Sequence, residues 1–134
     1  MRRLPDRVVV DPEVVDRGAE VVVVSEYGIE PVDHAVFINR ALREAGLLVI
    51  TRNAAGELLD PAASRAFAVC DHQLAHVYCV DADATSRAAA VLTKLAGIER
   101  IYALEERRQI GLDHPRSGEL IALATRGAWF AYDY

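Results

Sequence analysis

The chain has 134 residues, a hydrophobic content of 52% and a formal net charge of -5 at pH 7. This length predicts one domain with one core, and the apolar content excludes an intrinsically disordered protein. The acidic balance excludes the basic surface that binds nucleic acids, the scattered Lys and Arg residues argue against a membrane-surface role, and no apolar run approaches the roughly 20 residues that span a bilayer.

The first 18 residues predict an irregular lead-in, because they are polar and contain Pro5 and Pro12. They lack the long apolar stretch of a secretory signal. Residues 19–134 are expected to form a single α+β domain. Cys70 and Cys79 fall in one predicted strand, too far apart to bridge, so we expect reduced thiols and a cytoplasmic location.

The first predicted strand covers residues 20–25, because four consecutive valines suit a strand that is buried on both faces. Asp33 is placed to cap a helix that begins near His34 and stops at Gly46. Residues 66–80 predict either one long strand or a bent pair. In a single strand Cys70, His72, Leu74, His76 and Tyr78 share one face, unless a bulge near Asp71 and His72 swaps it.

The rest of the chain predicts further strands around one more helix. These elements, in order, are a strand at 47–51, a turn at 53–56, a returning strand at 57–59, a helix at 84–95, and strands at 100–104, 119–125 and 128–132. The whole order predicts a βαββαβ-like, ferredoxin-like α+β sandwich with extra C-terminal strands and with its helices on one sheet face.

A carboxylate follows the first predicted strand, in Ser25-Glu26-Tyr27-Gly28. Carboxylates at the carboxyl ends of buried strands often line ligand crevices, where they bind a metal or act as a base. Glu26 is therefore a candidate metal ligand. The alternative is a solvated turn residue.

The four histidines have no spacing typical of a metal site, since the sequence lacks HExxH, CxxC and His-x-His. On an extended strand His72 and His76 would lie roughly 13 Å apart, at about 3.3 Å per residue, so a shared ion would require a bend. His76 between apolar neighbours is also explained as a half-buried strand residue.

The segment GLDHPRSGE, residues 111–119, places an acid, an imidazole and a guanidinium in one loop. Arg116 together with backbone amides suits a phosphate group. Turn chemistry explains the proline, serine and glycine equally well, so both interpretations remain open.

Three stretches, taken in order, resemble one protein family. They are VVVVSEYGIEPVDHAVFINRALREAGLL, SRAFAVCDHQLAHVYC and GLDHPRSGELIALATRGAWFAY. Together they resemble the C-terminal part of bacterial type I phosphodiesterase/nucleotide pyrophosphatase-like proteins, in the alkaline phosphatase superfamily. The resemblance covers residues from about 19 to 134.

The resemblance implies hydrolysis of phosphate esters at a pair of divalent metals, typically zinc, by a threonine or serine nucleophile. In the wider family the strand like 21–24 ends in Ser-Asp-His-Gly, and its Asp and His bind metal. Here Glu26 keeps a metal-binding carboxylate, while Tyr27 replaces the imidazole with a phenol, a poor zinc ligand at neutral pH. The residues that the resemblance places near the substrate pocket are Tyr27, His72, Gln73, His114 and Arg116.

In the family the nucleophile and the first metal ligands lie upstream of the part that this chain resembles. We therefore expect a truncated or excised portion of such an enzyme, inactive alone. The rival hypothesis is a standalone module that binds a small ligand or dimerises through its aromatic segment Trp129-Phe130-Tyr132-Tyr134. A third possibility is a small enzyme that uses Glu26, His72 and His114.

Overall fold

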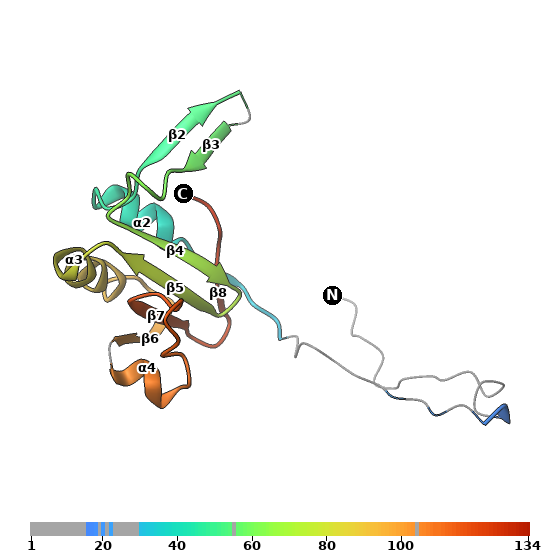
Figure 1. Cartoon of the computed structure of the whole chain (residues 1–134). Coiled ribbons are helices and arrows are strands. Elements are labelled where there is room, and N and C mark those ends of the chain that lie inside the picture. The colour runs from blue at the N-terminus through green and yellow to red at the C-terminus, as the bar shows by residue number, and fades with distance from the viewer. Residues whose placement is uncertain (1–15, 19, 21, 23–29, 55, 104) are drawn as a thin grey trace.

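A four-stranded antiparallel sheet forms the centre of the fold in the computed structural model, which describes residues 16–18, 20, 22, 30–54, 56–103 and 105–134 (Figure 1). Its strands are β4 (Ala66–Asp71), β5 (Leu74–Cys79), β6 (Ile98–Ala103) and β7 (Leu120–Ala124). They lie in the order β4-β5-β7-β6. The mixed composition of helices and sheets confirms the predicted α+β class.

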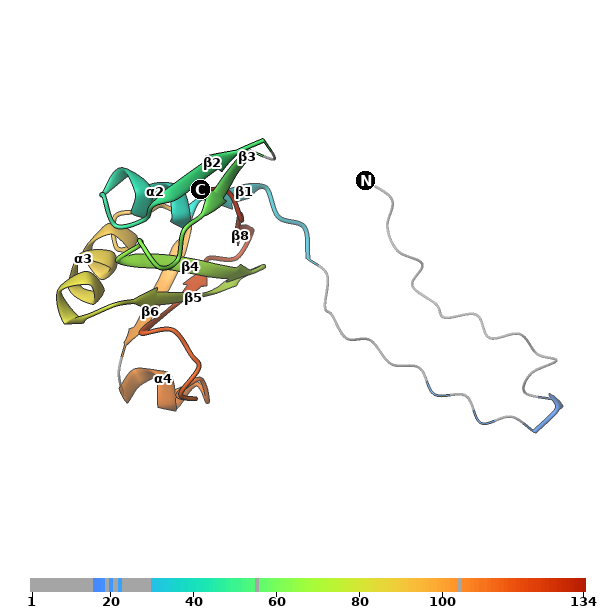
Figure 2. The ribbon, with the colours of Figure 1, turned by 45° about the horizontal axis from the view of Figure 1, so that its top comes forward.

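Two helices, α2 (Ile38–Glu44) and α3 (Ala82–Leu92), contribute to the core on one face of this sheet (Figure 2). The helix α3 starts where Asp81 accepts a hydrogen bond from the amide of Ala84 at 2.8 Å, as an N-cap residue does. Its buried face carries Ala84, Ala88 and Leu92. A short third helix, α4 (Glu105–Gln109), follows β6 and buries no residue.

The predicted ferredoxin-like order is not confirmed. In the four-stranded sheet, α3 connects β5 to β6, and β7 lies between these two strands. The split β-α-β unit is therefore present. The strand beyond β5 is β4, which precedes β5 in the chain, so this sheet is built from β4, β5, α3, β6, α4 and β7 in chain order rather than from βαββαβ.

Two smaller sheets flank the main one. The strand β1 (His34–Val36) pairs in parallel with β8 (Ala128–Phe130), and β2 (Ile50–Asn53) forms a hairpin with β3 (Gly56–Leu59). The prediction of a helix from His34 was wrong, because residues 34–36 pair with β8 and the helix begins at Ile38. A local sequence pattern cannot reveal a strand partner that lies so far away in the chain.

The predicted strand at 47–51 begins later, at Ile50. Leu47 and Leu48 are buried core residues, and the carbonyl of Leu47 accepts bonds from the amides of Arg65 and Ala66. The turn and the returning strand after it were predicted correctly. The predicted strand at 20–25 lies outside the described residues, apart from the isolated positions 20 and 22.

The segment 66–80 is the bent pair, and its bend changes the predicted faces. His72 and Gln73 form the turn between β4 and β5, and His72 has a φ of 53°. Across this turn Cys70 pairs with Ala75, and Val69 pairs with His76. Cys70 therefore lies on the buried face with Ala75 and Val77, whereas His76 lies on the opposite face.

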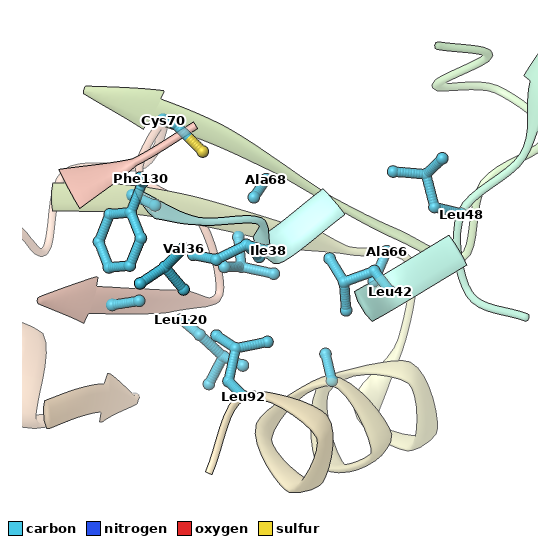
Figure 3. Close-up of a cluster of buried hydrophobic side chains, with 14 of the residues drawn as sticks. Val36, Ile38, Leu42, Leu48, Ala66, Ala68, Cys70, Leu92, Leu120 and Phe130 are labelled. Carbon is cyan, nitrogen blue, oxygen red and sulfur yellow. The ribbon is translucent and has the colours of Figure 1, made fainter. Parts of the chain in front are cut away.

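The core lies between the helices and the sheet, and the C-terminal segment is part of it (Figure 3). Its largest fully buried side chains are Phe130, Ile38, Leu42, Leu47, Leu92, Leu120 and Val77, whereas Ile121 is buried on the opposite face of the sheet, beside His76. Phe130 is wholly buried and Tyr132 is 57% exposed, so the aromatic segment is only partly available to a partner. No helix in the described parts of the chain is long and apolar enough to cross a membrane.

Candidate functional site

A cleft of about 860 Å³ opens at one end of the main sheet. Four parts of the chain form it: the turn between β4 and β5, the start of β6, the end of β7 with its connection to β8, and residues near Glu30. In Figure 1, β8 passes beside the tip of the β4–β5 hairpin, where the amide of Phe130 donates to the carbonyl of His72 at 2.7 Å. The residues that line the cleft are Glu30, Val32, Asp71, His72, Gln73, Leu74, Glu99, Leu123, Ala124, Thr125, Arg126, Gly127 and Trp129.

The turn that carries His72 and Gln73 is held from both sides. Besides the bond from Phe130, the carbonyl of Gln73 accepts from the amide of Ala124 at 2.8 Å. The side-chain amide of Gln73 donates to the carbonyl of Ala128 at 3.4 Å. These contacts to β7 and β8 keep a non-glycine residue, His72, in the left-handed region, which costs about 1–3 kcal/mol and is more common at functional sites.

Asp71 orients the imidazole of His72. Its Oδ1 lies 2.8 Å from Nδ1 of His72, although both side chains are exposed. A carboxylate only accepts hydrogen bonds when ionised, so Nδ1 of His72 is the donor in this contact. The predicted pocket residues His72 and Gln73 thus line one cleft.

The structure does not bring His114 and Arg116 to this cleft. They lie in the loop after α4, where Nδ1 of His114 accepts from the amide of Arg116 at 3.1 Å. The hydroxyl of Tyr78 donates to the carbonyl of Arg116 at 3.0 Å, and Nδ1 of His76 accepts from the amide of Gly118 at 3.2 Å. These bonds attach the loop to β5, so turn chemistry accounts for much of the motif.

The predicted metal ligand Glu26 and its neighbour Tyr27 lie outside the described residues, so their roles stay predictions. Within the described residues, no three His, Cys, Asp or Glu side chains are grouped so as to hold a metal ion. The acidic and imidazole groups of Asp71 and His72 bond to each other instead.

The two cysteines are free thiols on separate strands of the hairpin. Burial raises the pKa of Cys70 to about 11. Burial is also the main reason that the pKa of Cys79 is raised. Both groups are therefore protonated near neutral pH, as expected of small core residues rather than nucleophiles.

Most of the cleft has no local signature in the sequence. Glu99, Arg126 and Trp129 belong to distant segments, and no local spacing links them. The dipeptide Arg126-Gly127 gave a weak signal, because Gly127 occupies the left-handed region that a tight turn requires, at a φ of 83°.

A comparison with protein families matches residues 9–134 to the family described as type I phosphodiesterase / nucleotide pyrophosphatase. The chain belongs to this family. No curated protein and no solved structure matched the chain.

Type I phosphodiesterases are metal-dependent hydrolases as a family. A divalent ion is bound by several converging oxygen or nitrogen ligands. The described residues do not provide a group of three, so this part of the chain does not fit the ion by itself.

Proposed function

We propose that this chain is one portion of a metal-dependent phosphodiesterase and that it shapes the substrate pocket without hydrolysing esters alone. The family match over residues 9–134 carries this proposal. The substrate would be a small phosphate ester, and the metal would be zinc. The cleft at the β4–β5 turn is the surface that would face the substrate.

The resemblance supports a division of roles. In the family the nucleophile and the first metal ligands lie in a segment upstream of the part that this chain resembles. Glu26 would supply one metal-binding carboxylate, and His72 and Gln73 would contact the ester from the cap side. The free thiols of Cys70 and Cys79 support a reducing compartment such as the cytoplasm.

The hydrolysis of bis-p-nitrophenyl phosphate by the purified chain with added zinc tests the proposal. We expect release of nitrophenol at the rate of a protein-free zinc control. Turnover above that control, lost in Glu26→Ala but kept in His114→Ala, would show that the chain holds a working site and would overturn the proposal.

The second candidate function is a standalone module that binds a small ligand or forms a homodimer. The cleft favours ligand binding, and the exposed Tyr132 favours a contact between copies. Size-exclusion chromatography with light scattering measures the mass of the particle. A strict monomer whose melting temperature does not respond to small ligands would count against this function.

A further inference from the structure

The cleft has an apolar side that suits a flat or aliphatic group. Leu74, Leu123 and Trp129 lie along it, and all three are half-buried, so each retains some surface for a ligand. A tryptophan offers a large, rigid contact area at low entropic cost. Ligand sites of this kind combine an apolar wall with a few placed polar groups.

The charges of the cleft oppose a phosphate. Its lining carries three carboxylates, those of Glu30, Asp71 and Glu99, against one guanidinium, that of Arg126. Arg126 is also directed to an acid, since its Nε lies 3.5 Å from Oε2 of Glu30. An anion placed here meets an excess of like charge, whereas a neutral or cationic group does not.

The polar groups of the cleft are mainly acceptors. Asp71 lies 2.8 Å from Nδ1 of His72 and offers its remaining carboxylate lone pairs as acceptors. The carboxylates of Glu30 and Glu99 add further acceptors. A ligand that complements them carries hydroxyl or amine hydrogens, because ionised carboxylates only accept hydrogen bonds.

We infer that the cleft binds the organic group of a phosphate ester rather than its phosphate, and that this group is uncharged or cationic, with hydroxyl or amine donors. Trp129 and Leu74 contact its apolar part, and His72 contacts its polar part. This inference rests on the proposed function for the ester itself. The binding preference is a property of the cleft and is measurable without hydrolysis.

Three ring compounds of similar size test the preference: benzylamine, benzyl alcohol and benzoate. Trp129 is the only tryptophan in the sequence, so its fluorescence reports binding in the cleft directly. We expect saturable changes with benzylamine and benzyl alcohol, and affinity for benzoate lower by about tenfold or more, since like charge is costly at short range. Benzoate binding as tightly as benzylamine would overturn the inference, as would no saturable binding of any of the three.

Two variants test the residues. His72→Asn keeps a side chain that tolerates the left-handed region and removes the imidazole, so it should weaken benzyl alcohol severalfold. The matched control is His114→Asn, a histidine outside the cleft, which should not change the affinity. Equal affinities in His72→Asn and the unchanged protein would contradict the role of His72.

Glu99→Gln provides a charge test at an exposed position. It should reduce the preference for benzylamine over benzoate and leave benzyl alcohol unaffected. An unchanged preference would remove the electrostatic part of the inference. Because these measurements use no phosphate and no metal, their outcome does not depend on whether the chain hydrolyses esters.

Discussion

At the scale of single residues, Asn39 is the clearest case of a polar group that the fold requires. Its side chain is only 2% exposed. Its amide donates to the carbonyl of Ala68 at 2.9 Å, and its oxygen accepts from the amide of Ala68 at 2.7 Å. Since β4 is an edge strand, Asn39 takes the place of a neighbouring strand and joins α2 to the sheet.

Asn39→Ala should lower the free energy of unfolding by about 2–4 kcal/mol, because two backbone groups of Ala68 lose their partners in a buried site. Urea unfolding measures the change. The matched control is Lys94→Ala on the exposed surface, expected within about 0.5 kcal/mol of the unchanged protein. A loss in Asn39→Ala as small as that of the control would contradict this role.

At this scale, sequence patterns predicted the chemical state of side chains better than their location in the fold. The thiols were expected to be reduced, and both are free. His72 and Gln73 line a cleft, and their role as substrate-pocket residues stays a prediction. Arg116 and His114 were expected near the same pocket, but they lie in the loop after α4, where the carbonyl of Arg116 accepts from Tyr78 of β5 and His114 accepts from the amide of Arg116. The difference comes from Tyr78, whose partner lies 38 positions away and has no local signature.

At the scale of elements, the loop after α4 depends on a close approach of two backbones. A Cβ at Gly118 would lie 2.7 Å from the backbone nitrogen and oxygen of Val77, and backbone atoms there cannot move aside easily. The loop also accepts a bond from the guanidinium of Arg107 at the carbonyl of Gly118. Glycine at this position therefore allows the loop to lie on β5.

Gly118→Ala should destabilise the fold by about 2–3 kcal/mol through this overlap. Gly111→Ala is the control, since a Cβ there meets open space and costs about 1 kcal/mol through its φ of 70° alone. Thermal unfolding of both variants measures which substitution destabilises the fold more. If Gly111→Ala were the more damaging, the close approach to Val77 would not be the reason for this glycine.

The β2–β3 hairpin is attached to α2 by a charged cluster. The carboxylate of Glu57 lies 2.7 Å from Nη1 of Arg43 and 2.6 Å from Nη2 of Arg52. Hydrogen bonds from Arg43 and then Arg52 lower the pKa of Glu57 to about 2. Because the pKa is lower in the folded protein, the contribution is present above about 4.5 and is lost as the pH falls toward 2.

We therefore expect Glu57→Gln to lower stability at pH about 6 and to matter less at pH about 3, where part of the contribution has already been lost. Urea unfolding of both proteins at the two pH values measures this difference. High salt should also shrink it, because the cluster is solvent-exposed. A difference that is independent of pH would show that Glu57 does not act through its charge.

Elements with local signals were predictable, and elements with distant partners were not. The turn before Gly56 and the helix after Asp81 have strong local chemistry, and both are present. The strand β1 was mistaken for the start of a helix, because only its pairing with β8 makes it a strand. The cleft was not predicted for the same reason, because its walls come from segments that lie far apart in the chain.

At the scale of the whole molecule, the C-terminal strand completes the core. Phe130 is wholly buried among residues from α2, α3 and the sheet. Phe130→Ala should cost about 3–5 kcal/mol, whereas Tyr132→Ala, at a 57% exposed position, should cost far less. Chemical denaturation compares the two. Similar losses in both would contradict the burial of this strand.

The order of strands in the sheet could not be predicted from the sequence. Hydrophobic patterns distinguish strands from helices, but they do not say which edge a strand joins. The α+β class followed from the alternation of elements. The position of β7 between β5 and β6 follows only from antiparallel pairings that a single sequence does not encode locally.

The parallel pairing of β1 with β8 has a consequence for the order of folding. The β4–β5 hairpin and the α3 segment make contacts between near neighbours in the chain, and such contacts form early. The pairing of His34 with Ala128 closes a loop that spans most of the domain, so its entropic cost delays it. Because Trp129 lies in β8, its fluorescence in a rapid-mixing experiment should follow this final closure, later than the signal from helix formation.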